Sequence, residues 1–564
     1  MKIVIVGGVA GGASAATRLR RLNENAQITV FERSGYISYA NCGLPYYVGG
    51  VIEDPEELTL QTPESFWDRF RIDVRTKHEV TKIDIDKKTV TIRGLDSGKV
   101  FEESYDKLIL APGARPIRPN ISGIDSDKIF TLRTVEDTFR IRDYVVEKQP
   151  KTAVVVGGGF IGVEMAENLC ELGVKVTLVE GTNQLMNTLD YDMATLVHAK
   201  IRSKGIDLKL ENTVLGFEED GDTVNVLLKD DIKVKADIVL MAVGVAPEST
   251  LAKEAGIKLG IKNSIEVNDK METSVPDIYA VGDAVQVKHV VTNSDSLISL
   301  AGPANKQGRI AADNICGIES HYKGSLGSSV IKVFDMTATS TGITEKIAKK
   351  EGIKYDKVIL SPMSHAGYYP GGQIMTMKVV FEVDTLKILG AQIVGHGGVD
   401  KRIDVIATAI SAGIKANELK DLDLAYAPPY SSAKDPVNMA GFMIENISKG
   451  IVKQFYLEDL DSLKDDDSIT LLDVRTLGEY NKGHIEGFSH IPVDDLRDRL
   501  SEIDKSKPVY LMCQSGLRSY IASRILSQEG FDSYNFAGGY RFYSMVTKES
   551  KMAEKEYPCG MDIQ

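Results

Sequence analysis

The sequence has few cysteines, and no two of them stand close together. Its 564 residues contain five, with no CxxC pair: Cys42, Cys170, Cys316, Cys513 and Cys559. A disulfide framework needs paired cysteines and a structural zinc site needs clustered ligands, so this spacing argues against both. We expect reduced thiols in a cytoplasm, and each has to be interpreted alone.

The sequence also lacks a long apolar run and an excess of positive charge. No stretch approaches the roughly 20 apolar residues of a membrane helix, and the apolar N-terminal run is too short for a secretory signal. The formal net charge is -13, which argues against binding to nucleic acid or an anionic membrane over a broad face. An anionic small molecule in a local basic pocket is still allowed.

The length predicts several domains, roughly four at about 150 residues each. Two segments, 2–32 and 152–180, repeat one pattern: an apolar strand, a glycine-rich turn, a helix, and a second strand that ends in an acidic residue. This pattern is typical of parallel sheets that bind dinucleotides. We therefore expect an α/β protein with two Rossmann-like domains.

The rest of the chain changes character near residue 325. Alternating polarity at 374–381 predicts an antiparallel sheet, with helices near 400–415, and an acidic stretch precedes a new strand at 469–474. The predicted division is a first Rossmann-like domain (1–115 and 245–325), a second (116–244), an α+β domain (326–445), a linker (446–460), a fourth α/β domain (461–550) and a tail (551–564).

The second glycine-rich turn matches a dinucleotide fingerprint in full. Gly157, Gly159 and Gly162 provide the tight bend, the close approach to a pyrophosphate and the close helix packing that such a turn needs. Glu180 follows 18 residues after Gly162 at a strand end, where a carboxylate can bind a ribose hydroxyl. No arginine follows it to accept a 2'-phosphate, so NADH is favoured over NADPH.

The first turn departs from the fingerprint. Gly7 and Gly12 fit, but Val9 occupies the usual place of the second glycine. A single GxGxxG-like turn is weak evidence, because many such turns only bend the chain. Two strand-turn-helix units that each end in glutamate are much stronger evidence.

Three further motifs add a family resemblance. With the paired turns, APGARP (111–116), AVGVAP (242–247) and IYAVGDA (278–284) resemble the flavin-dependent pyridine nucleotide-disulfide oxidoreductases over residues 1–445. The resemblance implies that the first domain binds FAD, that Glu32 holds its adenosine ribose, and that Asp283 binds the ribityl chain. It also implies cofactor contacts at Ala111, Gly113 and Gly282, and hydride transfer from NADH to the flavin and on to sulfur.

Cys42 is the candidate redox thiol of this part of the chain. It stands in SYANCGLPYY without a second cysteine nearby. A solitary cysteine beside a reduced flavin carries its oxidised state as a mixed disulfide with a small thiol or as a sulfenic acid, so its partner must come from outside. The alternative is a small core residue, as we expect for Cys170 and Cys316.

The residues around Cys42 narrow the resemblance. SYANCGLPYY, SFWDR (65–69), SHAGYYPGG (364–372) and YAPPYSSAKDPVN (426–438) resemble coenzyme A disulfide reductases. That family implies a homodimer in which Tyr368 and Tyr426 reach the partner's cysteine and give general-acid help to a leaving thiolate. Tyr369 and Tyr430 are near alternatives, and ordinary aromatic packing is the competing interpretation.

Substrate contacts are also expected near the first turn. Arg18, Arg20 and Arg21 follow that turn on a helix, where they are candidates for the phosphates of coenzyme A, and Asn41 adjoins Cys42. A solvated basic face explains the arginines equally well.

A related peroxide- and oxygen-reducing branch carries a histidine in the first turn where this chain has Ala10, so we expect peroxidase or oxidase activity only as a side reaction.

The C-terminal stretch carries a second candidate thiol. Residues 461–550 resemble rhodanese domains through LLDVR, the loop Cys513 to Arg518, and NFAGGYR. The loop lies between a strand and a helix, which favours a cradle for a thiolate or persulfide. Four residues separate Cys513 from Arg518, a compact loop suited to one sulfur atom, with Asp473 and Arg475 as supports. The competing interpretation is an inactive interaction module.

These features together predict a cytoplasmic flavoprotein that uses NADH to reduce a persulfide, polysulfide, coenzyme A persulfide or coenzyme A disulfide. Two alternatives remain open. One is a coenzyme A disulfide reductase for thiol homeostasis with independent sulfur transfer. The other is a peroxidase- or oxidase-like redox sensor that acts through Cys42.

Overall fold

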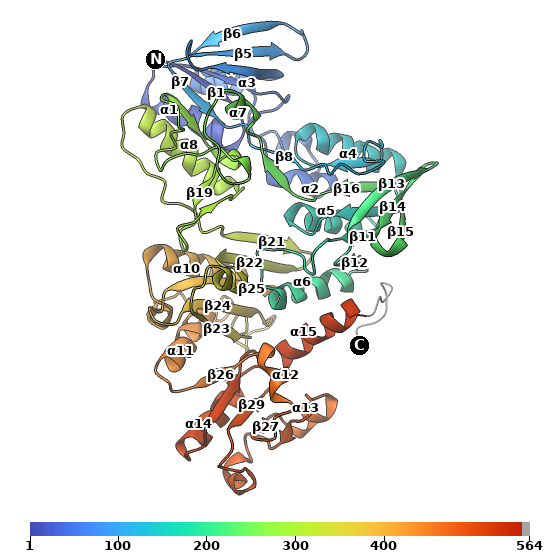
Figure 1. Cartoon of the computed structure of the whole chain (residues 1–564), viewed down its shortest axis with the longest axis vertical. Helices are drawn as coiled ribbons and strands as arrows, with labels where there is room; N and C mark the ends of the chain where they lie inside the picture. The colour runs from blue at the N-terminus through green and yellow to red at the C-terminus, as the bar shows by residue number, and fades with distance from the viewer. Residues whose placement is uncertain (555–564) are drawn as a thin grey trace. The chain divides into compact units, whose positions relative to one another are not determined.

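The computed structural model describes residues 1–554, with side chains as far as Glu549. The chain forms two compact units, one of residues 1–185 and 204–327, the other of 186–203 and the described residues from 328 onward. Figure 1 follows the chain from blue to red through both. Within residues 1–554, no helix is both long and apolar enough to cross a membrane.

The first Rossmann-like domain is built on a parallel sheet in the order β18-β7-β1-β2-β3. Alternate residues of β1 face opposite sides: Ile3 and Ile5 pack with α1 and α8, whereas Val4 and Val6 belong to a second cluster on the other face. Such a sheet, buried on both faces, explains the unbroken apolar run at the N-terminus. Its elements are β1 (Lys2–Val6), α1 (Ala10–Leu22), β2 (Gln27–Phe31), β3 (Asp73–Arg75), β7 (Lys107–Leu110), β18 (Ile278–Ala280) and α8 (Ala301–Ile315).

Short elements complete this domain. An antiparallel sheet in the order β4-β5-β6 follows β3, and two small ladders join β8 to β17 and β19 to β20. These elements are α2 (Leu44–Val48), α3 (Pro63–Phe70), β4 (His78–Asp84), β5 (Thr89–Gly94), β6 (Val100–Ser104), β8 (Ala114–Pro116), β17 (Val245–Pro247), α7 (Thr250–Glu254), β19 (Val287–Lys288) and β20 (Asp295–Ser296).

The second Rossmann-like domain repeats the plan with the order β12-β11-β10-β16-β9. A three-stranded antiparallel sheet, β13-β14-β15, packs its apolar face on the strands. The elements are β9 (Ile129–Thr131), α4 (Val135–Lys148), β10 (Thr152–Val156), α5 (Phe160–Glu171), β11 (Lys175–Val179), β12 (Asp207–Lys209), β13 (Val214–Asp220), β14 (Thr223–Leu228), β15 (Lys233–Ala236) and β16 (Ile238–Met241).

The second unit begins with the antiparallel sheet that the alternating pattern predicts. Its order is β21-β22-β25-β24-β23, and α10 packs against β22 and β25. The elements are β21 (Ser329–Val333), β22 (Met336–Gly342), α9 (Glu345–Lys350), β23 (Tyr355–Leu360), β24 (Thr376–Glu382), β25 (Ile388–Gly395), α10 (Val399–Ala412) and α11 (Pro436–Ser448). Helix α6 (Tyr191–Ser203), which follows β11 in the chain, also belongs to this unit.

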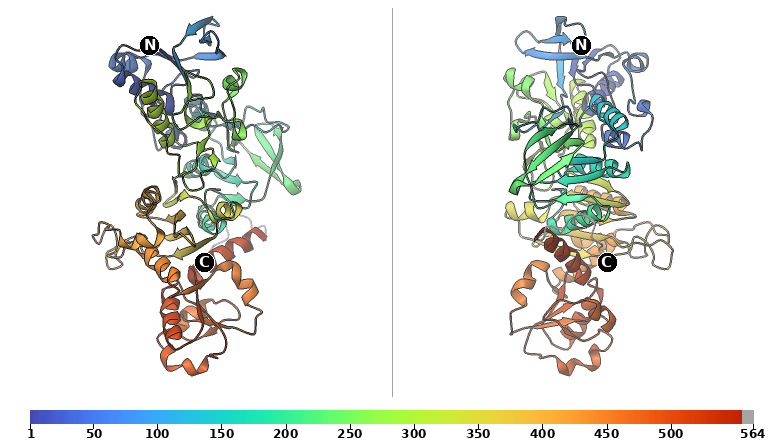
Figure 2. Two further views of the ribbon diagram at one scale, coloured as in Figure 1. Left: turned by 60° about the vertical axis from the view of Figure 1, so that its left-hand side comes forward. Right: turned by 90° about the vertical axis from the view of Figure 1, so that its right-hand side faces the viewer.

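The last domain is a parallel sheet in the order β26-β30-β29-β27-β28, drawn orange to red in Figure 2. Leu472 and Leu511 face a cluster with α14, whereas the neighbouring Leu471 and Met512 face a cluster with α12 and the start of α15. The elements are β26 (Lys453–Phe455), α12 (Leu460–Leu463), β27 (Thr470–Asp473), α13 (Leu477–Lys482), β28 (Ser489–His490), β29 (Val509–Met512), α14 (Leu517–Gln528), β30 (Ser533–Phe536) and α15 (Gly539–Glu554).

The structure differs from the predicted domain division at two places. The expected linker 446–460 contains β26, which pairs with β30 as an edge strand of the last sheet, because Phe455 is needed to cover its core. The expected tail 551–564 begins inside α15, and its remainder, with Cys559, lies outside the described residues.

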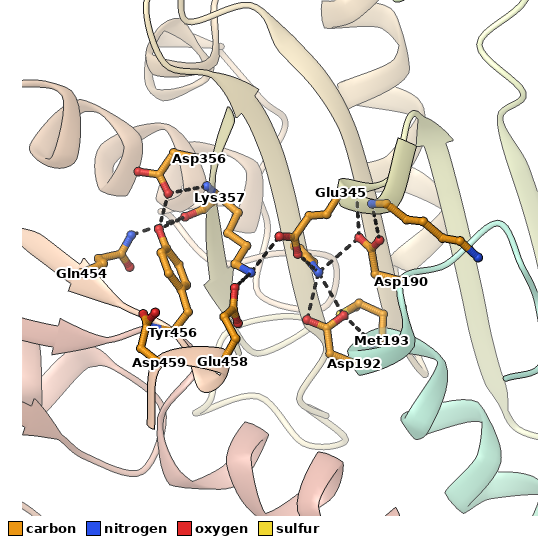
Figure 3. A network of polar contacts seen from close by, with 12 residues as sticks. Asp190, Asp192, Met193, Glu345, Asp356, Lys357, Gln454, Tyr456, Glu458 and Asp459 are labelled. Carbon is orange, nitrogen blue, oxygen red and sulfur yellow. Dashed lines mark hydrogen bonds and ion pairs between the residues drawn. The ribbon is translucent and has the colours of Figure 1, made fainter. Parts of the chain in front are cut away.

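An ionic ladder crosses the interior of the second unit (Figure 3). Lys378 on β24 is 1% exposed and pairs with Asp190, Asp192 and Glu345. Burial acts to lower the pKa of this ammonium group, but the three carboxylates outweigh it and raise the pKa. Lys357 continues the ladder from Glu345 to Glu458, at 2.8 and 2.7 Å. The ladder thus ties the start of α6 to the antiparallel sheet and to the entry of the last domain.

Candidate active sites

The two glycine-rich turns have the same backbone geometry. Gly7 and Gly157 have φ values of +99° and +111°, and a Cβ at either would come within 2.1 or 2.3 Å of a carbonyl oxygen of the neighbouring strand connection. Only glycine tolerates both conditions. Gly12 and Gly162 approach the first carbonyl of their own turn, where a Cβ would lie 1.9 and 1.8 Å away. Gly159, by contrast, faces open space within 4 Å, which leaves room for a phosphate.

The two acidic residues at the strand ends also have matching contacts. Glu32 accepts a hydrogen bond from the N–H of Gly8 at 2.8 Å. Glu180 accepts one from the N–H of Gly158 at 2.7 Å. Each carboxylate therefore lies against its own turn, where the ribose of a dinucleotide would lie. Val9 precedes α1 in an extended conformation, so the missing second glycine does not prevent the first turn from forming.

The residues expected around a flavin gather at the carboxyl ends of β7 and β18. Ala111 and Gly113 follow β7, and Gly282 and Asp283 follow β18. The Arg133 guanidinium lies 3.3 Å from the Asp283 carboxylate. Burial raises the pKa of Asp283 and Arg133 lowers it, with a net upward shift. A largely buried carboxyl group beyond the carboxyl end of a parallel strand is suited to hold hydroxyl groups, so these residues fit the FAD that the sequence predicts.

Cys42 lies in a short 3-10 turn, Asn41–Gly43, that leads into α2. The side chain is exposed. Its thiol pKa is raised, first by contact with the surrounding protein, which removes water, and then by the carboxylates of Glu164 and Asp283, while Arg133 lowers it. The thiol is therefore accessible to a substrate but is not activated by its immediate surroundings.

Glu164 lies outside every sequence motif, and its partner Tyr46 stands in SYANCGLPYY without having been singled out. The Tyr46 hydroxyl donates to Oε1 of Glu164 at 3.4 Å. Burial raises the pKa of Glu164 to about 7. A carboxyl group that is half protonated at neutral pH, close to a redox thiol, could be found only once the packing of α2 on α5 was known.

The tyrosines expected to reach a partner's cysteine lie in the second unit. Tyr368 and Tyr426 are 75% and 46% exposed, and their hydroxyl oxygens lie 2.7 Å apart. This hydrogen bond is the main cause of the raised pKa of Tyr426. The structure thus brings together the two preferred tyrosines, whereas Tyr369 packs edge-on against His365.

A buried arginine supports the loops that carry these tyrosines. Arg402 is fully buried and donates to the carbonyl oxygens of Ser364 and Tyr430 and to the carboxylate of Asp435. Asp435 also accepts from Ser431 at 2.7 Å. Sequence reasoning missed this residue, because a single arginine inside a helix gives no signal of burial.

The arginines on α1 separate into different roles. Arg20 is 6% exposed and donates to main-chain carbonyl oxygens, including those of Phe70 and Arg71, which fixes the chain beside α3. Arg18 pairs with Asp313 at 2.7 Å, and Arg21 is exposed. Asn41 is half-buried beside Cys42. Arg20 therefore holds the fold together, and Arg18 and Arg21 remain candidates for phosphate contacts.

Cys513 lies at the end of β29 and is fully buried. Its sulfur accepts hydrogen bonds from the N–H of Gly516 at 3.1 Å and from the hydroxyl of Ser519 at 3.2 Å. Gly516 precedes the first turn of α14, so the sulfur also faces the positive end of that helix. The loop provides a cradle for a negatively charged sulfur, as the sequence predicts, and Ser519 is a donor that sequence reasoning missed.

Charged pairs surround this cradle. Arg518 forms a two-point ion pair with Glu479, at 2.6 and 2.7 Å, which lowers the pKa of Glu479 to about 2. Asp473 and Arg475 are almost fully buried and pair at 2.7 Å. The Arg475 guanidinium also stacks 3.9 Å from the ring centre of Tyr540. These pairs hold both ends of the loop, which supports its compact size.

A family model described as pyridine nucleotide-disulphide oxidoreductase matches residues 1–308, and its dimerisation domain matches 328–436. The chain belongs to this family. A rhodanese-like domain model matches residues 456–545. The family depends on FAD and NAD(H), so the predicted fold class, enzyme class and dinucleotide cofactors are confirmed.

Relatives resemble the chain over most of its length. The coenzyme A disulfide reductase of Staphylococcus haemolyticus is 38% identical over 79% of this chain and 100% of its own. The reduced CoADR-RHD of Bacillus anthracis has a TM-score of 0.95 at 50% identity, covering 97% of this chain and 98% of that one. The NAD-dependent persulfide reductase from A. fulgidus has a TM-score of 0.90 at 38% identity, covering 96% and 100%.

Proposed function

We propose that this enzyme passes electrons from NADH through FAD to a sulfur-sulfur bond at Cys42. Its substrate is a persulfide, a polysulfide or coenzyme A persulfide, and the rhodanese-like domain handles sulfane sulfur. The observation that carries the proposal is the presence of two isolated thiols in two reactive settings, Cys42 in an open turn and Cys513 in a cradle of donors. The relatives that reduce coenzyme A disulfide and persulfide support it.

The proposed reaction starts at Cys42. Its thiolate attacks the carrier sulfur of R–S–SH, which forms the mixed disulfide Cys42–S–S–R and releases hydrosulfide. When bound, FAD would supply the transfer of two electrons from NADH to this disulfide. One proton is taken from solution, so that R–S–SH, NADH and H⁺ become R–SH, H₂S and NAD⁺. Glu32 and Asp283 would hold FAD, and Glu180 would hold the ribose of NADH.

The rhodanese-like domain supplies the sulfur chemistry that precedes this step. The Cys513 thiolate takes the outer sulfur from a donor persulfide, which leaves as a thiol, and then presents it to an acceptor thiol such as coenzyme A. The donors from Gly516 and Ser519 stabilise the charge on sulfur. Arg518, held by Glu479, keeps a positive charge at the loop.

We further propose a cytoplasmic homodimer in which the Tyr368 and Tyr426 pair of one subunit serves the Cys42 of the other. The pair is exposed, and the domain that carries it matches a dimerisation domain. A phenol can donate a hydrogen bond to a leaving thiolate. Asn41 would orient the substrate beside Cys42, and Arg18 and Arg21 would contact the phosphates of coenzyme A.

The test is an anaerobic NADH-oxidation assay with coenzyme A persulfide and with coenzyme A disulfide, using Cys42→Ser, Cys513→Ser and the control Cys170→Ser. We expect Cys42→Ser to lose turnover with both substrates, about 1000-fold or more. Cys513→Ser should keep NADH oxidation and lose only sulfur transfer. Full NADH-linked turnover in Cys42→Ser would overturn the proposal.

A second candidate is a coenzyme A disulfide reductase that maintains the thiol pool. The similarity to the Staphylococcus haemolyticus enzyme over 79% of the chain favours it. The same assay separates the two, because a thiol-pool enzyme should prefer the symmetrical disulfide by kcat/KM and should keep that preference when Cys513 is replaced.

A further inference from the structure

Glu164 is a half-buried carboxyl group that the proposed reaction does not yet use. It lies on α5, and the hydroxyl of Tyr46 donates to it at 3.4 Å. Burial raises its pKa to about 7, with the charge of Glu167 adding to the effect and the Tyr46 hydrogen bond opposing it. At neutral pH this group therefore exists in both its neutral and its charged form.

The packing of α2 on α5 ties Glu164 to the redox thiol. Tyr46 follows Cys42 by one turn of chain, at the centre of α2. Gly49, at the end of α2, packs so closely on α5 that a Cβ there would lie 2.0 Å from the amide oxygen of Asn168. Asn168 in turn donates to the main-chain oxygen of Glu164 at 2.8 Å. The hydroxyl of Tyr46 is thus held beside Glu164, on the helix that follows the Cys42 turn.

Charged groups of both signs act on the Cys42 thiol, and carboxylates act on Glu164 and Tyr46. Burial, followed by the charges of Glu164 and Asp283, raises the pKa of the Cys42 thiol, and Arg133 lowers it. Glu167 on α5 acts on both Glu164 and Tyr46. From α4, Arg142 donates to the carbonyl oxygen of Val48 on α2. Burial, followed by the charge of Glu164, raises the pKa of Tyr46, so its hydroxyl stays neutral and can only pass a proton on.

The chemistry at Cys42 consumes one proton in each turnover. Reduction of Cys42–S–S–R by two electrons yields two sulfur anions, and the hydride of NADH supplies a proton for only one of them. The second must come from another acid. We propose that the Glu164 carboxyl group, acting through the Tyr46 hydroxyl, supplies this proton to the leaving sulfur and is then reprotonated from solvent. The inference rests on the proposed role of Cys42 and deepens it.

The inference predicts two pH effects of defined sign. The carboxyl group carries its proton below about pH 7 and loses it above, so kcat should fall as the pH rises through 7. Glu164→Gln keeps the shape and an acceptor for Tyr46 but has no proton to give. We expect its kcat at pH 6 to be about 100-fold lower, without the fall near pH 7.

A second readout does not depend on turnover. Alkylation of Cys42 by iodoacetamide, followed by mass spectrometry of the reduced holoenzyme, reports the thiolate fraction. Because Glu164→Gln removes a negative charge near the thiol, the midpoint of alkylation should move down by about half a pH unit. Tyr46→Phe removes the hydroxyl that passes the proton but leaves the Glu164 carboxylate in place. Its kcat should no longer fall near pH 7, whereas the alkylation midpoint of Cys42 should stay unchanged.

The matched control is Glu171→Gln, an exposed glutamate at the end of the same helix, which should change neither profile. Two results would overturn the inference. One is a set of pH profiles for Glu164→Gln that match those of the wild type, and the other is a higher KM for NADH as the only effect of the substitution. Either result differs from failure of the proposed function, in which Cys42→Ser would keep its turnover.

Discussion

The two reactive thiols of this chain are built in opposite ways. Cys513 is fully buried, and its sulfur accepts hydrogen bonds from Gly516 and Ser519 within its own loop. Cys42 is exposed, and the carboxylates of Glu164 and Asp283 oppose its ionisation. The rhodanese-like site therefore contains its own activating groups. In the proposed function, the Cys42 site depends instead on groups that come from elsewhere: the cofactor, the substrate and the tyrosines.

This difference follows from the secondary structure that carries each thiol. A strand that leads directly into a helix aims successive N–H groups at the intervening loop, so the Cys513 cradle forms from local sequence. A 3-10 turn between longer segments has no such array of donors. Its environment comes from distant elements, here α5 and the turn after β18. Four perturbations test the contrast, in order of decreasing expected effect.

The largest effect is expected from Arg475→Met. Its loss leaves Asp473, which is 0% exposed, without its buried partner, and breaking such a pair costs about 3–5 kcal/mol. Sulfur transfer at 37 °C should disappear, while NADH-linked reduction at Cys42 stays within about twofold. Sulfurtransferase assays and limited proteolysis measure the two results. Equal loss of both activities would contradict the independence of the sites.

Tyr368→Phe should affect the other site. Removing a hydroxyl that is hydrogen-bonded to Tyr426 takes a hydrogen-bond donor away from the leaving thiolate, so kcat for NADH-linked reduction should fall about 100-fold. Sulfur transfer should not change. Tyr369→Phe is the matched control, since that ring packs on His365. A larger effect in the control than in Tyr368→Phe would favour the alternative tyrosine.

Ser519→Ala removes one of the two donors to the Cys513 sulfur. A hydrogen bond to a charged group contributes about 1.5 kcal/mol, so the rate of sulfur transfer should drop about tenfold. The reductase rate should stay the same. Ser523→Ala on the same helix, whose hydroxyl bonds to the carbonyl oxygen of Tyr520, is the control. An unchanged transfer rate would mean that the backbone donor suffices.

The smallest effect is expected at Cys42 itself. Its thiol pKa is raised, so the midpoint of alkylation in the reduced enzyme should lie above the ordinary thiol value of roughly 8.5. Arg133→Gln removes the one cation that lowers this pKa and should move the midpoint further up by less than about one unit. Arg140→Gln, an exposed arginine on α4, is the control. A downward shift would contradict the described electrostatics.

Much of both sites could be predicted from sequence because the signals are local. Gly7 and Gly157 occupy turns whose backbone only glycine permits, and the spacing of Cys513 and Arg518 defines a loop by itself. Alternating polarity likewise predicted β24, and the helix expected near 400–415 is α10.

Other features could not be predicted, because they depend on which distant segments meet. Arg20 was a candidate for phosphate contacts, with a solvated basic face as the alternative, yet it is buried against the main chain beside α3. The segment 446–460 is polar enough to suggest a linker, yet β26 completes a sheet whose other strands follow it. The ladder around Lys378 joins residues from three stretches of chain.

The sequence by itself predicts the two dinucleotide turns, the two candidate thiols and the compact loop around Cys513, since each depends on backbone geometry over a few residues. Only the tertiary structure decided the acidity of Glu164, the pairing of Tyr368 with Tyr426 and the burial of Arg402. These properties depend on desolvation and on charges contributed by segments far apart in the chain, and neither is encoded in local spacing.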